Sequence, residues 1–259
     1  MEKRRVTFRD RLARSAVPLL FALLCLFGIL VAHINLEFLL REMLARVARN
    51  GILVMALLIP ILAGLGLNFG IVLGAMAGQI AAIVATYWGF KGIAGFGVAS
   101  ALAVPLAIAF GIGTGLLFNR AKGREMVTGL IAGFFANGLY QLVFLFAIGS
   151  LIPWHAASML LPQGFGLRNT IDLYNIQYAL DDLIKVHMTL DNQPVRVPVV
   201  TFGFIGLVCL FNIFFQRTRL GQEFRAMGQD PHVAAASGIA VDRNRVIATV
   251  MSTVFAAWG

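Results

Sequence analysis

The sequence predicts an all-α fold, a bundle of transmembrane helices that crosses a membrane about seven times. Of the 259 residues, 59% are hydrophobic and only 13% are charged, and the mean hydropathy is +0.84. Soluble domains are about half apolar and about a quarter charged. The apolar residues also gather in long runs, and segment 51–90 contains no charged residue. These observations exclude a soluble enzyme and a nucleic-acid-binding domain, although the pI is near 10.4.

Each apolar run accounts for one or two predicted spans. The first, 16–34, follows a basic segment but no small-residue cleavage pattern follows it, so a retained helix is favoured over a signal peptide. Residues 36–50 place apolar and charged residues on opposite sides of a helix, which predicts an interfacial amphipathic helix. Segment 51–90 would be about 60 Å long as one helix, twice the bilayer core. It is predicted to form two passes, or one pass and a re-entrant piece, with a break near 64–68.

Three further spans and part of a seventh follow. They are predicted at 94–118, 127–151, 198–215 and from residue 246 onward. A helix over 246–259 is about 21 Å long and too short to cross. We therefore expect residues 1–259 to form one transmembrane domain that is incomplete at its C-terminus. The longest polar connection is 152–197, in which residues 172–190 have the apolar spacing of an amphipathic helix.

The charged residues orient the predicted helices. The N-terminal segment, 119–126 and 216–245 together carry 14 Lys and Arg against six Asp and Glu, a net charge of +8. In this topology 36–50, Lys91 and 152–197 lie on the other side, and their net charge is +1. Lys and Arg are enriched on the cytoplasmic side of membrane proteins. The pattern predicts a cytoplasmic N-terminus and cytoplasmic segment 216–245, with 152–197 outside.

Glycines recur every four residues at Gly66, Gly70, Gly74 and Gly78. On one helix they would form a stripe without side chains, which predicts close packing against a neighbouring helix. On the same helical wheel, a polar face lies opposite the stripe and consists of Asn68, Gln79 and Thr86. Polar groups are costly in lipid. This face is expected either to line a solute path or to hydrogen-bond neighbouring helices.

The span predicted at 127–151 carries a second polar face. The face contains Asn137, Tyr140, Gln141 and Phe144. Amides beside aromatic rings suit a flat polar solute such as a nucleobase or a sugar, and ordinary packing is the alternative interpretation. No Asp, Glu, Lys or Arg lies inside any predicted span, which disfavours a carrier driven by an ion gradient.

No pattern in the sequence is typical of an enzyme or a metal site. A Gly-x4-Gly-Lys-Ser/Thr loop is absent, so this chain has no P-loop for ATP. The four histidines do not stand with Cys, Asp or Glu at ligand spacing. Cys25 and Cys209 lie in apolar runs, where neither a disulfide framework nor a thiolate metal site is indicated. We expect a chain that is not an enzyme and binds no metal or cofactor itself.

The most informative segment lies within 216–245. It predicts a polar helix through Ala226, a turn at 228–231, and a second short helix that begins at Pro231 and ends at Gly238. Such a short helix, rich in Ala and Gly, could present a surface without large side chains that fits a groove of a partner protein. The alternative is a solvated connector.

This segment resembles the permease subunits of prokaryotic ABC importers for ribose-type sugars, nucleosides and branched-chain amino acids. Their cytoplasmic loop has the pattern T-x-x-G-x-x-x-R-A-x-G-x-x-P-x-x-A-x-x-x-G-I. The sequence matches the pattern at nine positions: Thr218, Gly221, Arg225, Ala226, Gly228, Pro231, Ala234, Gly238 and Ile239. Ala235 also fits the pattern. Weaker similarities cover 66–79, 122–127 with Asn137, and 254–259.

The resemblance implies a permease of a bacterial cytoplasmic membrane that works by alternating access. Its implied partners are an ATPase subunit that binds ATP and Mg²⁺, a second permease subunit, an extracytoplasmic substrate-binding protein and the lipid bilayer, but no nucleic acid. The implied ATPase-coupling residues are Arg225, Ala226, Gly228, Asp230, Pro231, Ala234, Ala235, Gly238 and Ile239. A nucleoside or sugar is the favoured solute. The alternatives are a branched-chain amino acid permease of the same class and an ion-gradient-driven secondary transporter.

Overall fold

The computed structural model describes residues 8–32, 36–153, 159–162, 164–168, 171–173, 176, 179–180, 186–190 and 193–259. Seven apolar helices run through these residues: α1 (Phe8–Ala32), α2 (Leu36–Leu62), α3 (Ile71–Tyr87), α4 (Gly92–Arg120), α5 (Glu125–Leu142), α6 (Val199–Phe215) and α9 (Val241–Trp258). A π-helical turn, η1 (Val143–Ala147), continues α5, and two short helices, α7 (Arg219–Gln229) and α8 (Pro231–Ala236), connect α6 to α9. The predicted helical membrane bundle is thereby confirmed.

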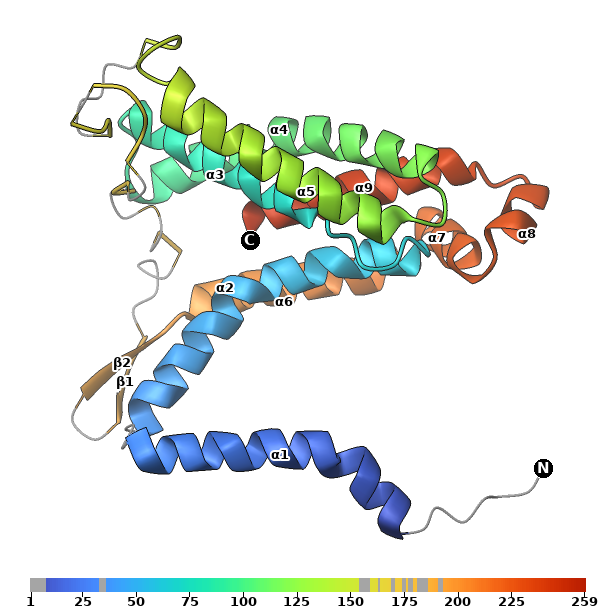
Figure 1. Ribbon diagram of the computed structural model, residues 1–259, viewed down its shortest axis with the longest axis horizontal. Coiled ribbons are helices and arrows are strands. Elements are labelled where there is room, and N and C mark those ends of the chain that lie inside the picture. The colour runs from blue at the N-terminus through green and yellow to red at the C-terminus, as the bar shows by residue number, and fades with distance from the viewer. Residues whose placement is uncertain are drawn as a thin grey trace.

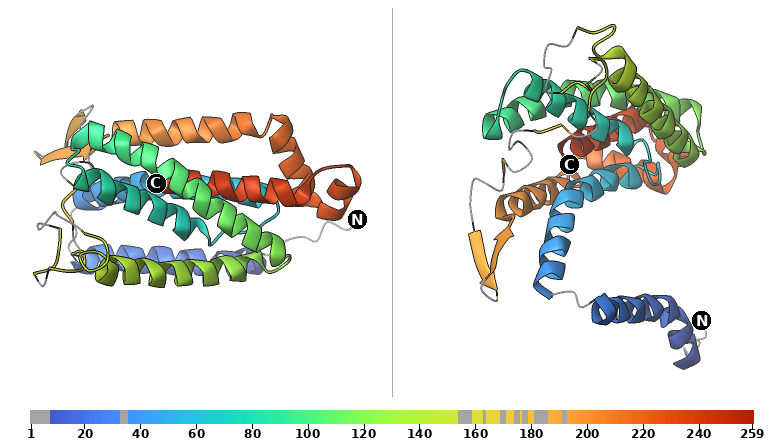
Figure 2. Two further views of the ribbon diagram at one scale, coloured as in Figure 1. Left: turned by 90° about the horizontal axis from the view of Figure 1, so that it is seen from above. Right: turned by 60° about the vertical axis from the view of Figure 1, so that its left-hand side comes forward.

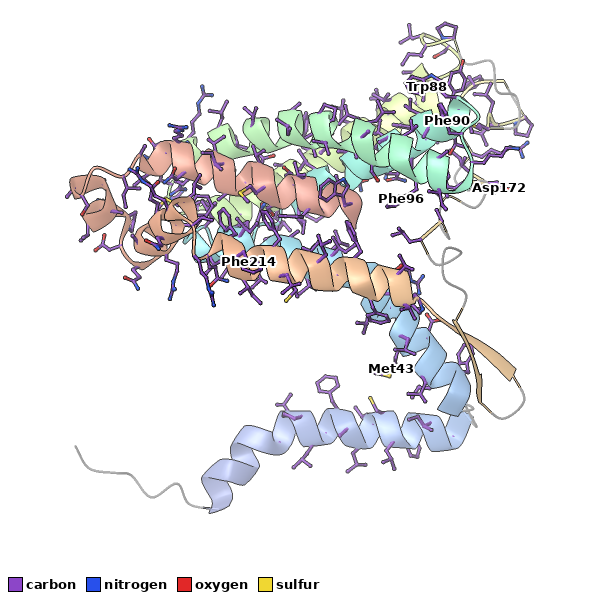
Figure 3. All side chains as sticks on the ribbon, turned by 180° about the vertical axis from the view of Figure 1, so that it is seen from behind. Met43, Trp88, Phe90, Phe96, Asp172 and Phe214 are labelled. Atoms are coloured by element: carbon purple, nitrogen blue, oxygen red, sulfur yellow. The ribbon has the colours of Figure 1, made fainter. Side chains whose placement is uncertain are left out.

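Helix α9 occupies the centre of the bundle. It packs against α2, α3 and α4, while α6 lies along α2, and α5 lies on the outer side of α3 and α4 (Figures 1 and 2). Helix α1 stands apart from the others (Figure 1), and its described side chains are largely exposed. Large apolar side chains, including Met43 and Phe214, are exposed on the outside of the bundle (Figure 3). An apolar outer surface of this kind is expected of helices that face lipid.

Fewer than seven helices meet the length and composition of a membrane span by themselves. Among the described residues three do, namely Phe38–Leu62, Gly92–Arg120 and Glu125–Ala147, and a fourth results if α6 and α7 are counted together across their 76° bend. The prediction of about seven spans is therefore too high by this criterion. Helix α3 has only 17 residues because residues 63–70 before it are not helical. Helix α9 does not meet the composition of a span because its first turns carry charged residues.

Two local predictions are wrong. Residues 36–50 do not form a separate interfacial helix, because α2 continues without a break from Leu36 to Leu62. Residues 172–190 do not form one helix either, since Val186–Leu190 is a strand, β1, that pairs antiparallel with β2 (Gln193–Val197). This hairpin is an exception to the all-α prediction. Pairing with a partner strand outweighs the helical spacing of residues 186–190.

The predicted break in segment 51–90 is confirmed. Helix α2 ends at Leu62 and α3 begins at Ile71, and the stretch between them contains residues 64–68. The four-glycine stripe is only partly helical, because Gly66 lies in this stretch and Gly70 directly precedes α3. Gly74 and Gly78 lie on α3 against α9. A Cβ atom on Gly74 would lie 2.7 Å from Cβ of Ala256, and one on Gly78 would meet the carbonyl oxygen of Ala257.

The connections gather at two opposite ends of the bundle (Figure 1). At one end lie α7, α8, the stretch 63–70 and the α4–α5 connection, residues 121–124. At the other end lie the α3–α4 connection, the described parts of 148–180 and the β1–β2 hairpin. We call them the elbow end and the hairpin end. This grouping agrees with the predicted topology, in which 119–126 and 216–245 share one side.

Candidate coupling elbow and solute pocket

Helices α7 and α8 form an elbow, residues 218–239, that is built by two capping side chains. The Thr218 hydroxyl accepts a hydrogen bond from the Gly221 backbone N–H at 3.2 Å and begins α7. The Asp230 carboxylate accepts from the backbone N–H groups of His232 and Val233 at 2.8 and 3.2 Å and begins α8. These two backbone hydrogen bonds hold the pKa of Asp230 below its ordinary value. Pro231, the first residue of α8, suits that position because it needs no N–H partner.

The bend is sharper than predicted. Helix α7 continues to Gln229, so Gly228 lies in its last turn and not in a turn over 228–231. Only Asp230 separates α7 from α8. Gly238 follows α8 with φ of +83°, a conformation that favours glycine.

The inner face of the elbow is packed into the bundle core. Phe224, Met227 and Ala234 are buried together with residues of α2, α6 and α9. Gly228 lies so close to the end of α2 that a Cβ atom there would meet the Leu62 carbonyl oxygen. Gly64 faces it with φ of +74°, and a Cβ on Gly64 would lie 2.8 Å from Cα of Gly228. The elbow is therefore fixed to the point where α2 ends.

The outer face of the elbow is exposed. Val233 at the apex of α8 is 62% exposed. The other candidate coupling residues divide by burial: Arg225, Gly228, Asp230, Pro231, Ala235 and Gly238 are exposed, Ala226 and Ile239 are half-buried, and Ala234 is buried. Ala234 consequently belongs to the packing of the elbow on the bundle. The outer face of the elbow therefore offers the guanidinium of Arg225, the carboxylate of Asp230 and the apolar side chain of Val233.

A polar link ties α7 to α9. The buried Asn244 side-chain amide donates to the Glu223 carboxylate at 2.9 Å, and Arg219 pairs with the same carboxylate at 3.2 Å. The Asn244 hydrogen bond, followed by that of Arg219, lowers the pKa of Glu223. A displacement of α7 is thereby tied to the first turn of the central helix.

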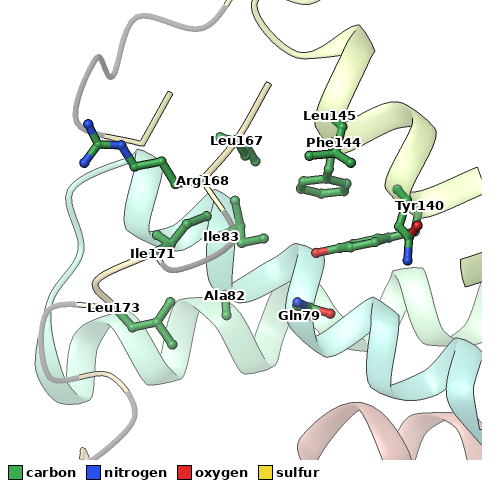
Figure 4. A pocket seen from close by; sticks show the side chains of 11 residues that line it. Gln79, Ala82, Ile83, Tyr140, Phe144, Leu145, Leu167, Arg168, Ile171 and Leu173 are labelled. Carbon is green, nitrogen blue, oxygen red and sulfur yellow. The ribbon is translucent and has the colours of Figure 1, made fainter. Parts of the chain in front are cut away.

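A pocket of about 510 Å³ lies between α3, α5 and the described loop residues of the hairpin end (Figure 4). Its polar lining includes the side chains of Gln79, Tyr140 and Gln141, with Arg168 at one edge. The rings of Tyr140 and Phe144 are stacked, with centroids 4.2 Å apart. Four of the seven residues predicted to form the solute path therefore meet in one cavity: Gln79, Tyr140, Gln141 and Phe144.

Residues 39–259 match the protein family described as "Branched-chain amino acid transport system / permease component". The match covers more than half of the chain and includes every helix except α1 and the first residues of α2. The chain belongs to this permease family. Comparisons with curated proteins and with solved structures find no match.

Three predicted path residues of this permease lie elsewhere. Asn68 is buried in the stretch before α3, so it does not share a helical face with Gln79. Its amide donates to the Ser252 hydroxyl of α9 at 3.2 Å, and its carbonyl oxygen accepts from Gly70 N–H at 2.9 Å. Thr86 is buried and donates to the Ala82 carbonyl oxygen of its own helix. Asn137 is exposed and lines neither described cavity.

One buried ion pair of the permease was missed by sequence reasoning. Arg245 of α9 pairs with Glu125, the first residue of α5, and the two side chains are only 10% and 13% exposed. Arg245 also donates to the Phe118 carbonyl oxygen of α4 at 3.3 Å. The prediction assigned both residues to cytoplasmic connections. The available signal was the helical pattern of 241–258, which places Arg245 inside a helix.

Within the described part of the chain, no three His, Cys, Asp or Glu side chains gather where they could share a metal ion. Among the described residues, polar side chains of this permease gather at three places. They cap the elbow, they bind α9 to its neighbours, and they line the pocket. Such an arrangement can bind a partner and a solute.

Proposed function

We propose that this chain is the membrane-spanning permease subunit of an ATP-driven importer and that the elbow receives the ATPase subunit. The observation that carries the proposal is the two-sided character of the elbow. Its inner face is buried on α2 and α9, while its outer face exposes Arg225, Asp230 and Val233. A surface that is anchored on the bundle helices and open to a partner is suited to transmit a partner's displacement.

The proposal places the elbow end and the N-terminus in the cytoplasm of a bacterium with the chain in its inner membrane. The excess of Lys and Arg in 119–126 and 216–245 supports this orientation. ATP and Mg²⁺ are bound by the ATPase subunit and not by this chain. A second permease subunit completes the path, and an extracytoplasmic substrate-binding protein delivers the solute to the hairpin end.

Coupling requires that the ATPase bind two conformations of the permease differently. A displacement of the elbow reaches α2 through Gly228 in the last turn of α7, which lies close to the Leu62 carbonyl oxygen. It reaches α9 through the hydrogen bond between Glu223 and Asn244. Helix α9 packs on α3, whose Gln79 lines the pocket. These contacts form a continuous physical connection from the elbow to the pocket.

The solute that we favour is a nucleoside or a sugar. The stacked pair Tyr140–Phe144 offers ring contact, and the amides of Gln79 and Gln141 offer donors and acceptors. A branched-chain amino acid is the competing solute within the same family. The affinities of the purified chain for adenosine, ribose and leucine separate these classes of solute.

Co-purification with the ATPase tests the assignment of the elbow. Val233→Asp places a charge on the exposed apex, where the side chain packs on little of the permease, and should abolish recovery of the ATPase with the permease. Val233→Ala keeps the apex apolar and should retain the complex. Ala240→Asp, at an exposed position just beyond the elbow, is the matched control and should also retain it. Equal recovery of the ATPase with Val233→Asp would refute the assignment.

A further inference from the structure

A second cavity forms an apolar groove between α3, α4 and α5. Its volume is about 630 Å³. Ile131, Phe135 and Leu139 of α5 line it opposite Phe110 and Leu117 of α4. Its lining is almost entirely apolar, in contrast to the solute pocket. Tyr140 and Phe144 line both cavities, so their stacked rings form a shared wall.

The groove follows the length of α5. Its lining runs from Thr128, one turn inside the elbow end, to Phe144, which corresponds to about 24 Å of helix. One leaflet contributes about half of a hydrocarbon core about 30 Å thick. The only buried residues of α5 are Gly129 and Gly133. The groove is therefore long enough for one extended acyl chain and is open along a loosely packed helix.

Two arginines continue the walls of the groove at the elbow end. Arg124 directly precedes α5 as its N-cap residue and lies four residues before Thr128, the first groove-lining residue of that helix. Arg120 ends α4 and lies three residues after Leu117, on the groove-lining face of α4. Both are exposed, and neither has an ion-pair partner among the residues that the structure describes. The neighbouring Lys122, in contrast, is paired with Asp242 at 2.7 Å.

From this combination we infer that the groove is a binding site for one anionic phospholipid. An acyl chain lies between α4 and α5, and the phosphate group is held by Arg120 and Arg124. The charges of both arginines complement a phosphate, and basic sites between helices on the cytoplasmic side of membranes recognise anionic headgroups. The site shares the wall formed by Tyr140 and Phe144 with the solute pocket, and none of its described lining residues belongs to the elbow.

Native mass spectrometry of the full chain tests the site. The chain is reconstituted in vesicles of equal phosphatidylglycerol and phosphatidylcholine, extracted, and titrated with each lipid. We expect one phosphatidylglycerol to be retained in preference to phosphatidylcholine. The double variant Arg120→Gln with Arg124→Gln should weaken the binding of phosphatidylglycerol about 30-fold, because each basic residue contributes about 1 kcal/mol to the binding of an anionic lipid. Arg243→Gln removes an exposed charge from the elbow end outside the groove and should leave the affinity unchanged.

A second pair of variants tests the acyl-chain half of the site. Gly113 lines the groove and has open space where a Cβ would lie, so Gly113→Leu should fill the groove without a clash and weaken lipid binding. Gly138 on α5 also faces open space but lies outside the groove, and Gly138→Leu should have no effect. The inference is wrong if both lipids bind equally or if the double arginine variant matches Arg243→Gln. It is also wrong if Phe135→Cys cross-links two copies through the groove.

Discussion

Helices α9 and α5 differ in their packing although both are apolar and both begin at the elbow end. Helix α9 buries eight residues, six of them with small or uncharged polar side chains: Asn244, Ala248, Thr249, Ser252, Thr253 and Ala256. Helix α5 buries only two glycines, while Phe134 and Phe135 are 70% and 72% exposed. One helix is held on several sides, and the other rests loosely on the bundle.

The difference follows from side-chain size and from hydrogen bonds. Small residues allow α9 to approach the glycines of α3 and α4. Its hydroxyl groups find partners across helices, as Thr253 does with the Ala107 carbonyl oxygen at 3.0 Å. The bulky residues of α5 leave cavities on its sides instead. A tightly held helix can transmit a displacement, whereas a loosely held helix can line a path or a lipid groove.

The largest effect is expected where the two helices meet, at the ion pair of Arg245 with Glu125. Glu125→Ala leaves Arg245 buried without a counter-charge and should lower the free energy of unfolding by about 3–5 kcal/mol. Unfolding by sodium dodecyl sulfate in mixed micelles measures this. The exposed pair Glu42–Arg46 is the control, and Glu42→Ala should cost less than about 1 kcal/mol. Equal costs would show that the Arg245 pair contributes no more than a surface contact.

The packing contrast itself predicts the next effect. Gly78→Leu forces a side chain against the backbone of α9 at Ala257 and should destabilise the permease by about 1–3 kcal/mol. Gly138→Leu on α5 meets no neighbour and should change stability by less than about 0.5 kcal/mol. Both variants are compared in the same unfolding assay. If Gly138→Leu proves as damaging as Gly78→Leu, α5 is not loosely packed.

The loosely packed helix α5 is expected to affect solute binding without affecting the stability of the protein. Tyr140→Leu removes the ring that stacks on Phe144 and should weaken binding of the solute about 3- to 10-fold. Asn137→Ala, on the same helix but outside both described cavities, should bind normally. Isothermal titration of the purified chain with the solute provides the comparison. Normal affinity in Tyr140→Leu would remove the pocket from the solute path.

The smallest effect concerns the cap of α8. The native pKa of Asp230 lies below its ordinary value of 3.8, so the stability that its charge contributes is present above that value and declines as the pH falls through the lower, native pKa. The protection of the His232 and Val233 amides against hydrogen exchange, measured relative to the intrinsic exchange rate at each pH, should therefore fall only in acid. Asp230→Asn keeps a capping oxygen and should abolish this pH dependence. A loss of protection that begins near neutral pH would contradict the assigned cause.

Local patterns in the sequence determine the helices and much of the elbow. The absence of charge between residues 51 and 90 and the glycines near 64–68 predict a break in this segment, as observed. The pairing of distant residues has no such local pattern. Asn68 bonds to Ser252, 184 residues away, and Arg245 to Glu125, 120 residues away. Their burial depends on which helices become neighbours, and the register of β1 with β2 likewise depends on a partner strand.

Solute uptake by proteoliposomes tests the central proposal most directly. Vesicles contain the permease and the ATPase, and the initial rate of uptake of a labelled solute is measured with ATP and, separately, with a proton gradient alone. The account predicts uptake that requires ATP, is lost in Val233→Asp and persists in Val233→Ala. Uptake driven by the gradient without ATP, or equal ATP-driven rates in Val233→Asp and the unsubstituted protein, would contradict it.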